Sequence, residues 1–281
     1  VGENTLGIDL TCLPDTDNIC NPKGVIAEAQ SLAAEAFGAR DAFFLVNGTT
    51  SGIQAMIMST CKPGEKLILP RNAHKSAFGG LILSGATPVY VRPEMDLEYG
   101  ISMGVSLDSL EFALREHPDA KGIFIINPNY YGTASDLKGI VELAHAYQVP
   151  VLVDEAHGAH LHLSDDLPLS AMEAGADISA SSTHKLLGSM GQSSMLLMKS
   201  DLINTNRVKS TLNITQTTSP SYVLMSSLDL ARKQMAVSGK ELLAKVLKLA
   251  HWARREMQQI PGIKVFEPKG NSASFACLKC C

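Results

Sequence analysis

A lysine ends a short run of small and hydroxyl-bearing residues in the segment ISASSTHKLLG, residues 178–188. The apolar start of this run predicts a buried strand over 177–181, which places Lys185 in the turn at the carboxyl end of that strand. A lysine partly removed from water there has a lowered pKa, and its neutral amine can attack a carbonyl group to form an imine. Taken alone, an exposed lysine at the start of a helix explains the same residues better.

The segment NGTTSG, residues 47–52, follows the apolar run AFFLV and leads into a predicted helix. Gly48 permits a tight turn, and the hydroxyls of Thr49, Thr50 and Ser51 lie beside the first N–H groups of the helix. Such a turn can bind an anion, and simple N-capping by a hydroxyl is the competing interpretation. The chain contains no G-x-x-x-x-G-K-[ST] segment, so this is not a P-loop.

Asp154 ends the apolar run PVLVD, and His74 follows another strand-like run in the segment RNAHKS. A carboxylate at the end of a buried strand needs a cation or strong donors as partners. A single histidine after a strand is more often a surface or capping residue. The three histidines at positions 157, 160 and 162 do not have the spacing of a metal site, so no metal is predicted.

The apolar runs are nearly continuous, as expected for strands that are buried on both faces, and amphipathic segments alternate with them. We therefore predict a three-layer α/β/α sandwich with a mainly parallel seven-stranded sheet. The predicted strands are 42–46, 66–70, 87–91, 122–126, 150–154, 177–181 and 194–198. The predicted helices are 51–60, 73–84, 106–116 and 135–147, the last with Ser135 as its N-cap.

Because ligands bind at the carboxyl ends of parallel strands, the polar residues after the strands are expected to lie together. Jointly they match pyridoxal 5′-phosphate (PLP). Its phosphate needs N–H and hydroxyl donors, its ring nitrogen needs a carboxylate, its face needs a flat neighbour and its aldehyde needs an amine.

From about residue 8 to residue 268 the sequence resembles the bacterial ornithine/lysine/arginine decarboxylases, a family of fold-type-I PLP enzymes with the aspartate-aminotransferase-like fold. The S-T-H-K segment together with RNAHKS is specific for this family, whereas DEAH is also found in oxoamine synthases of the same fold type. The segments that carry the resemblance are DLTCLPDTDN, EAQSLAAEAFGA, FFLVNGTTSG, RNAHKS, YYGTASDL, VDEAHGAH, SSTHKLLGSMGQSSML and TTSPSYVLMSSLD.

The resemblance implies that Lys185 forms the imine with the cofactor aldehyde, that Asp154 pairs with the ring nitrogen and that His74 stacks on the ring. His157 would lie near the cofactor. The catalytic residues implied are Lys185, His74 and Asp154. The residues expected to bind the phosphate are Thr49, Thr50, Ser51, Ser182 and His184. The segment QTTSPSY is similar to one that crosses a dimer interface, so Thr217 and Thr218 are expected to reach the phosphate of a partner subunit.

The activity that the resemblance implies is decarboxylation of a basic amino acid, with arginine favoured over lysine and ornithine, in polyamine metabolism. A homodimer or higher homo-oligomer with shared active sites is expected. The alternatives are an aminotransferase or oxoamine synthase that uses the same cofactor anchors, and a truncated PLP-binding homologue without activity.

The formal net charge is −4 among 281 residues, and no basic cluster or long apolar run occurs. Neither nucleic acid nor a membrane is therefore an expected partner, and a cytoplasmic protein with free thiols is expected. The predicted organisation is an N-terminal segment with a first helix (1–40), a PLP-binding major domain (41–220) and a C-terminal part (221–281). That part should hold two long helices, broken at Ser238-Gly239, and a strand-like stretch GIKVFEP that begins a truncated C-terminal domain. From the sequence at its two ends, we expect this chain to be a fragment of a longer protein.

Overall fold

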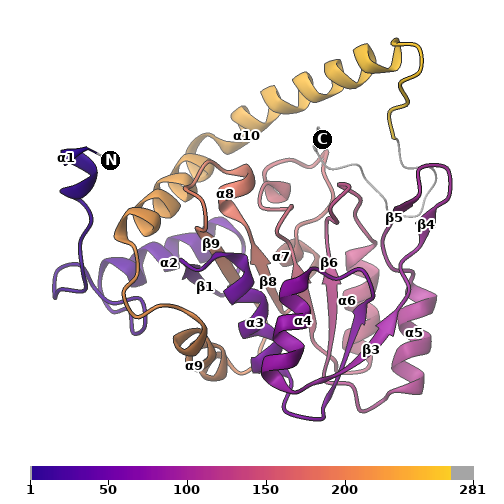
Figure 1. The fold of residues 1–281 in the computed structure, drawn as a ribbon, viewed down its shortest axis with the longest axis horizontal. Helices are drawn as coiled ribbons and strands as arrows, with labels where there is room; N and C mark the ends of the chain where they lie inside the picture. Colours follow the sequence, from indigo (N-terminus) through magenta and orange to yellow (C-terminus); the bar gives the residue numbers. More distant parts are fainter. Residues whose placement is uncertain (1, 267–281) are drawn as a thin grey trace.

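The computed structural model describes residues 2–266, which form a seven-stranded sheet with helices on both faces (Figure 1). The strand order is β1-β9-β8-β7-β6-β2-β3. The strands are β1 (Asp41–Leu45), β2 (Lys66–Pro70), β3 (Thr87–Val91), β6 (Gly122–Ile126), β7 (Val151–Asp154), β8 (Ile178–Ser181) and β9 (Ser194–Met198). All seven predicted strands are confirmed, within a residue or two at their ends.

One strand of this sheet runs against the others. Strand β9 pairs antiparallel with both β1 and β8, whereas β2, β3, β6, β7 and β8 pair in parallel. The segment between β8 and β9 folds back, so that β9 lies beside β8 and runs in the opposite direction. That turn contains Lys185, and the predicted mainly parallel sheet is confirmed.

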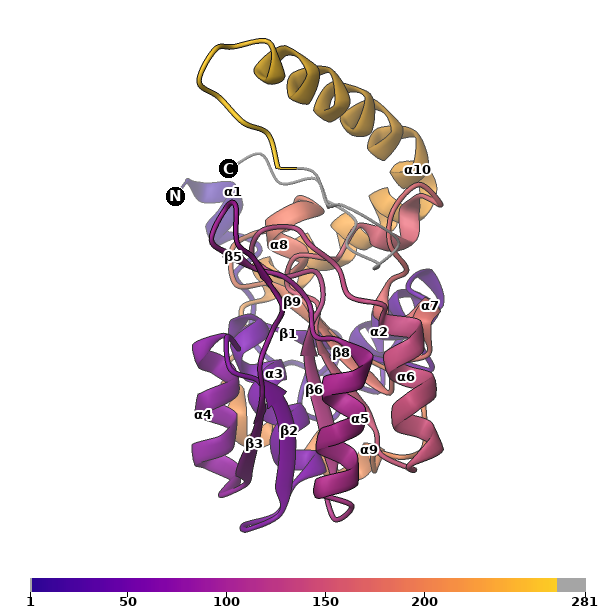
Figure 2. The same ribbon diagram turned by 90° about the vertical axis from the view of Figure 1, so that its right-hand side faces the viewer.

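Helices cover both faces of the sheet (Figure 2), and an apolar layer lies between the helices and the sheet on each face. On β6 the side chain of Phe124 packs into one layer, whereas Ile123 and Ile125 pack into the other, as the alternation of a strand requires. The layer around Phe124 contains α3 (Gly48–Thr60), α4 (Lys75–Ser84) and α9 (Thr205–Thr215). The opposite layer contains α2 (Val25–Ala36), α5 (Leu107–Glu116), α6 (Leu137–Ala146), α7 (Ala171–Ala174) and part of α10 (Tyr222–Gln258).

Helix α10 corrects the prediction of two helices broken at Ser238-Gly239, because it continues through both residues. A glycine inside a helix usually weakens it, but here it permits a close contact. A Cβ atom at Gly239 would lie 2.8 Å from Leu163 Cδ2, so the missing side chain lets the helix pass directly over the short helix η1 (Leu161–Leu163). The glycine therefore reflects packing and not a break.

The N-cap of α6 is a second correction. The carboxylate of Asp136 accepts a hydrogen bond from the Gly139 N–H at 3.0 Å, so Asp136 is the N-cap instead of Ser135. The remaining predicted helices are confirmed. The elements that were not predicted are α1 (Glu3–Leu6), β4 (Met95–Asp96), β5 (Ile101–Ser102), η1, α7, α8 (Thr183–Leu186) and α9.

The N-terminal part is held by Asp17, whose carboxylate accepts backbone hydrogen bonds from Lys23, Gly24 and Ile26 at the start of α2. The backbone carbonyl of Asp17 accepts a hydrogen bond from the Tyr222 hydroxyl at 2.7 Å. Burial alone would raise the pKa of Asp17, but these N–H donors lower it to about 2. The start of α2 is thereby tied to the start of α10.

Three cysteines, Cys12, Cys20 and Cys61, are free thiols as predicted. Cys277, Cys280 and Cys281 lie outside the described residues, as does the end of the stretch GIKVFEP, whose residues 263–266 are not in a strand. None of the helices in the described part of the chain combines the length and the apolar character that crossing a bilayer requires.

Candidate active site

A cavity of about 660 Å³ opens at the carboxyl ends of the parallel strands. Its wall comes from the turns that follow β1, β2, β6, β7 and β8, which are far apart in the sequence. The predicted residues that line it are Thr49, Thr50, His74, Asp154, His157, Ser182, His184 and Lys185. A cavity of this size and position is typical of a cofactor site.

Lys185 lies on α8, directly after β8, and its side chain reaches the cavity. Its Nζ atom lies 3.3 Å from the Nε2 atom of His157, which belongs to the turn after the neighbouring strand β7. The ring of His157 in turn meets that of Tyr130 edge-on, with centroids 5.9 Å apart. An amine and an imidazole in contact can exchange a proton.

Asp154 is the last residue of β7 and is only 3% exposed. Burial raises its pKa to about 6, while the Ala156 N–H, which donates to its Oδ1 at 3.1 Å, and the charge of Lys185 act in the opposite direction. A buried carboxylate with so few partners is expected to favour a cationic group beside it. Asp154 thus lies at the cavity wall with part of its charge uncompensated.

His74 is the N-cap of α4, and its Nδ1 atom accepts a hydrogen bond from the Ser76 N–H at 3.3 Å. The neutral ring therefore carries its proton on Nε2. Burial lowers the pKa of His74, and the charges of Lys185 and Lys75 lower it further. A neutral, flat ring at the cavity wall is suited to stacking against an aromatic ligand.

The start of α3 also faces the cavity. Gly48 has a φ of 73°, in the left-handed region that favours glycine, and its N–H donates to the Gln192 carbonyl at 3.0 Å. The N-cap residue Asn47 makes no capping hydrogen bond through its side chain. The hydroxyl of Thr49 contacts those of Ser182 at 2.5 Å and Ser194 at 2.8 Å. Because no side chain of the N-cap residue caps α3, the amino end of this 13-residue helix is open to a negatively charged group.

Two of the predicted phosphate-binding residues, Ser51 and His184, make hydrogen bonds to backbone carbonyls. The hydroxyl of Ser51 donates to the Gly48 carbonyl at 2.9 Å, and its side chain does not line the cavity. The Nδ1 atom of His184 lies 2.9 Å from the carbonyl of Ser193, so it must carry the proton. A neutral His184 therefore has an unprotonated Nε2 and can donate to a phosphate only when it is doubly protonated.

Thr217 and Thr218 do not line the cavity and are exposed. The Thr217 N–H donates to the Asn47 side chain at 3.4 Å, so this segment runs beside the amino end of α3. Both threonines thus lie at the edge of the site on the surface of the chain.

Several other residues that line the cavity were not predicted from the sequence. Asn129 donates to the Ser102 carbonyl at 2.7 Å and accepts from Tyr131 N–H, which ties the β4–β5 hairpin to the turn after β6. Gln192 has a φ of 77°, rare for a residue with a side chain, and no sequence signal marks it. The additional lining residues include Asn72, Ser76, Ser102, Asn129, Tyr130, Tyr131 and Gln192.

The donor set of this cavity fits PLP. The open amino end of α3 matches a phosphate, the partly uncompensated Asp154 matches a protonated ring nitrogen, and Lys185 provides an amine on the same wall. His74 provides a flat neutral ring. In residues 2–266 no group of three His, Cys, Asp or Glu side chains converges as a metal site would require.

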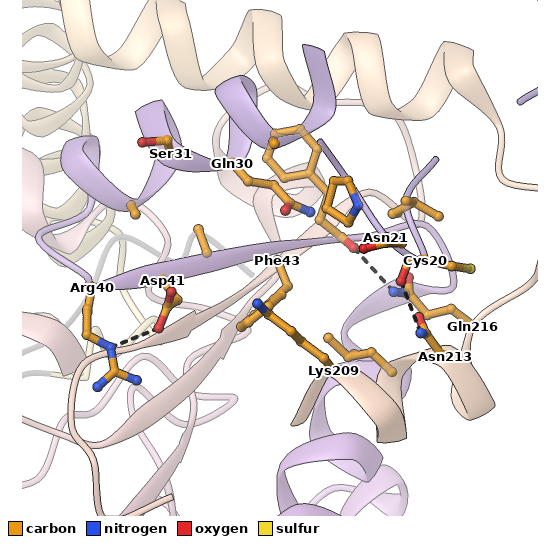
Figure 3. A pocket seen from close by; sticks show the side chains of 17 residues that line it. Cys20, Asn21, Gln30, Ser31, Arg40, Asp41, Phe43, Lys209, Asn213 and Gln216 are labelled. Atoms are coloured by element: carbon orange, nitrogen blue, oxygen red, sulfur yellow. Dashed lines mark hydrogen bonds and ion pairs between the residues drawn. The ribbon is translucent and has the colours of Figure 1, made fainter. Parts of the chain in front are cut away.

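A second cavity, of about 290 Å³, lies at the outer edge of the sheet between α2, β1 and α9 (Figure 3). The amide of Gln30 points into it from α2, and Gln216 covers the edge of β1 by accepting from Val46 N–H at 2.9 Å. None of the predicted site residues lines this cavity. We therefore assign the chemistry to the larger cavity.

The fold and the strand-end site place this protein among the α/β proteins of PLP fold type I. More narrowly, the chain belongs to the Orn/Lys/Arg decarboxylase family, because the model of that family's major domain matches residues 1–274. An arginine decarboxylase of Bacillus subtilis (strain 168) is 55% identical over 263 residues, which cover 94% of this chain and 54% of the relative. The chain thus spans about half the length of this curated relative.

Solved structures agree with this assignment. Lysine decarboxylase A from Pseudomonas aeruginosa superimposes with a TM-score of 0.80 at 26% identity, covering 94% of this chain and 39% of that one. A serine palmitoyltransferase variant from S. paucimobilis with a bound PLP–myriocin aldimine matches with a TM-score of 0.65 at 17% identity, over 82% of this chain and 58% of that one. At that identity the second structure shows the fold alone.

Proposed function

We propose that this chain forms the PLP-binding part of a decarboxylase that acts on a basic amino acid. The observation that carries the proposal is the meeting of Lys185, Asp154, His74 and the open start of α3 around one cavity at the strand ends. The family assignment supports decarboxylation, and the 55% identical arginine decarboxylase supports arginine before lysine or ornithine.

Each residue has a distinct role in this proposal. Lys185 would hold the cofactor covalently through its aldehyde, Asp154 would keep the ring nitrogen protonated, and His74 would pack on the ring face. The N–H groups at the start of α3 would bind the phosphate, with the Thr49 and Ser182 hydroxyls beside them. The bound cofactor supplies an electron sink for the electron pair left when CO₂ departs.

The proton that replaces CO₂ on the substrate Cα must come from a group at the cavity wall. Lys185 is one candidate, because its Nζ atom lies 3.3 Å from His157 Nε2 and can be reprotonated there. The Nε2–H of His74 is the other candidate, since Nδ1 is occupied by Ser76. The buried Asp154 is excluded as the donor if it pairs with the ring nitrogen.

A shared active site between two copies of the chain is also part of the proposal. Thr217 and Thr218 are exposed beside the amino end of α3, a position from which a partner subunit can be contacted. Measuring the mass of the protein in solution with and without the double substitution Thr217→Asp/Thr218→Asp tests this part, because two added charges would separate the subunits.

The activity is tested by incubating the protein with PLP and, separately, with arginine, lysine and ornithine, and by measuring CO₂ and the matching amine. We expect CO₂ and amine in equal amounts, with arginine the best substrate. A keto acid formed without CO₂ would instead identify an aminotransferase. Cofactor binding with no turnover of any of the three would identify a non-catalytic homologue.

A further inference from the structure

Glu155 follows Asp154 directly and is equally buried, with 3% of its surface exposed. Its Oε1 atom accepts a hydrogen bond from the Ala171 N–H at 2.6 Å, at the start of α7. Its Oε2 atom accepts a weaker one from the Ser179 hydroxyl of β8 at 3.4 Å. The acid, which directly follows β7, therefore contacts α7 and β8, and neither partner carries a charge.

The backbone of Glu155 makes two further contacts. Its N–H donates to the Ala180 carbonyl at 3.0 Å, and its carbonyl accepts from the Gly158 N–H at 2.9 Å. Gly158 is packed so closely that a Cβ atom there would lie 2.6 Å from Glu155 Cγ. The side chain is thus enclosed on the side of the sheet that α7 covers.

The contacts of Glu155 surround the two residues that matter most to the site. Asp154 is its chain neighbour, and β8, which Glu155 contacts through Ser179 and Ala180, leads into Ser182 and Lys185. We propose that Glu155 is a positioning residue: its buried carboxyl group joins β7, α7 and β8, and so fixes the distance between Asp154 and the turn that carries Lys185. This inference rests on the function proposed above for that site.

Glu155 is a neutral carboxylic acid at neutral pH. Burial raises its pKa to about 8, and the charges of Glu173 and Asp154 raise it further, against the two hydrogen bonds that lower it. A neutral acid presents a carbonyl oxygen to the Ala171 N–H and a hydroxyl group to Ser179, and the Ser179 hydroxyl can then accept this hydrogen bond instead of donating it. Glutamine presents a carbonyl and an amide of the same shape, so it reproduces both contacts without a titrating proton.

The first experiment measures unfolding against pH for the wild type, Glu155→Gln and Glu155→Ala, with Glu142→Gln as a control on the exposed face of α6. The ordinary pKa of 4.5 applies to the unfolded chain and about 8 to the folded chain, so the folded state holds the extra proton between these values. The stability that the neutral Glu155 side chain contributes is therefore present below pH 4.5 and is lost as the pH rises toward 8.

Relative to Glu155→Gln, the unfolding constant of the wild type should rise about tenfold for each pH unit in that range. Glu142→Gln should follow the wild type at every pH. If the unfolding constants of Glu155→Gln and the wild type changed with pH in parallel, Glu155 would not be a neutral buried acid. This conclusion does not depend on whether the protein is an enzyme.

The second experiment measures the dissociation constant of PLP for the same variants at a temperature where each remains folded. Glu155→Ala should bind PLP about tenfold more weakly, the loss expected when buried hydrogen bonds are removed, and Glu155→Gln should restore binding to within about twofold. Equal PLP affinity in Glu155→Ala and the wild type would overturn the positioning role. If Glu155→Ala does not fold, an equally weak affinity in Glu155→Gln and Glu155→Asp would overturn it.

These outcomes are separable from a failure of the proposed function. If the wild type does not bind PLP at all, the function proposed for the cavity is wrong, and the pH curves still decide whether Glu155 is a buried neutral acid. If the wild type binds PLP and Glu155→Ala binds it equally well, only the positioning role is wrong.

Discussion

The hydroxyl of Thr49, at the start of α3, lies 2.5 Å from the hydroxyl of Ser182, which precedes the lysine turn, although 133 positions separate the two residues. Both side chains are buried, and Thr49 also contacts Ser194 at 2.8 Å. This contact joins the predicted phosphate-binding helix to the predicted imine-forming lysine. It makes the two halves of the site one rigid unit, which is what a cofactor held at both ends requires.

We expect that Thr49→Val and Ser182→Ala each weaken PLP binding about fivefold, since each removes one hydrogen-bonding group at a cost of about 1 kcal/mol. The double variant should lose less than the sum of the two, because both substitutions break the same contact. Equilibrium dialysis with PLP measures these affinities. Ser226→Ala, on the exposed side of α10, is the control and should bind as the wild type does. Strictly additive losses would show that the contact is not shared.

Gly48→Ala should lower the free energy of unfolding by about 1 kcal/mol, because alanine is strained at the φ of 73°. It should also weaken PLP binding, since the strain shifts the N–H groups that face the phosphate. Gly64→Ala is a matched control: its φ is 81°, its N–H is also bonded to another loop, and neither position has an atom within 4 Å of an added Cβ. Gly64→Ala should lose about as much free energy of unfolding as Gly48→Ala, and it should bind PLP as the wild type does. Unchanged binding in Gly48→Ala would argue against a phosphate at the start of α3.

Acid pH should weaken PLP binding through Asp154. Because burial raises the pKa of this carboxyl to about 6, it is ionised above that pH and neutral below it, and only the ionised form can pair with a protonated ring nitrogen. Binding measured from pH 5 to pH 8, at about one-unit steps around that pKa, should therefore fall on the acid side in the wild type. Asp154→Asn should bind weakly at every pH without this step. The same step in both proteins would assign it to another group.

Asp17→Ala should lower the free energy of unfolding by about 1 kcal/mol near neutral pH, because it removes the carboxylate that holds the start of α2. The pKa of Asp17 is lowered from 3.8 to about 2 when the chain folds. The stability that it contributes is therefore present above 3.8 and is lost as the pH falls toward 2. Urea titrations of both proteins at neutral and acid pH measure this. Equal stability at neutral pH would contradict the role of Asp17.

The sheet could be predicted from the sequence because its strands are buried on both faces and appear as continuous apolar runs. That alone placed Lys185, Asp154 and His74 at one edge, since parallel strands end together. The direction in which a small hydroxyl points could not be predicted. Ser51 can donate to Gly48 or to a ligand at similar cost, and only the packed helix decides between them.

The same limit applies to contacts between distant segments. The pairing of His184 with Ser193 depends on how the turn between β8 and β9 closes, which no local pattern reports. Gly239 signals a helix break by propensity, but its packing against Leu163 overrides that propensity. The burial of Glu155 was not predicted, because it depends on the position of α7, a four-residue helix without periodicity.

The most direct measurement for the whole account is the identification of the residue that binds PLP covalently. The protein is mixed with PLP and reduced with borohydride, which fixes an imine as a stable amine, and its peptides are mapped by mass spectrometry. We predict that Lys185 is the one modified lysine of the wild type and that Lys185→Ala is not modified. Lys209 lines the smaller cavity and not the larger one, so Lys209→Ala is the control and should be modified as the wild type is. Modification of a different lysine, or of Lys185→Ala to the same extent, would contradict the assignment of this cavity as a PLP site.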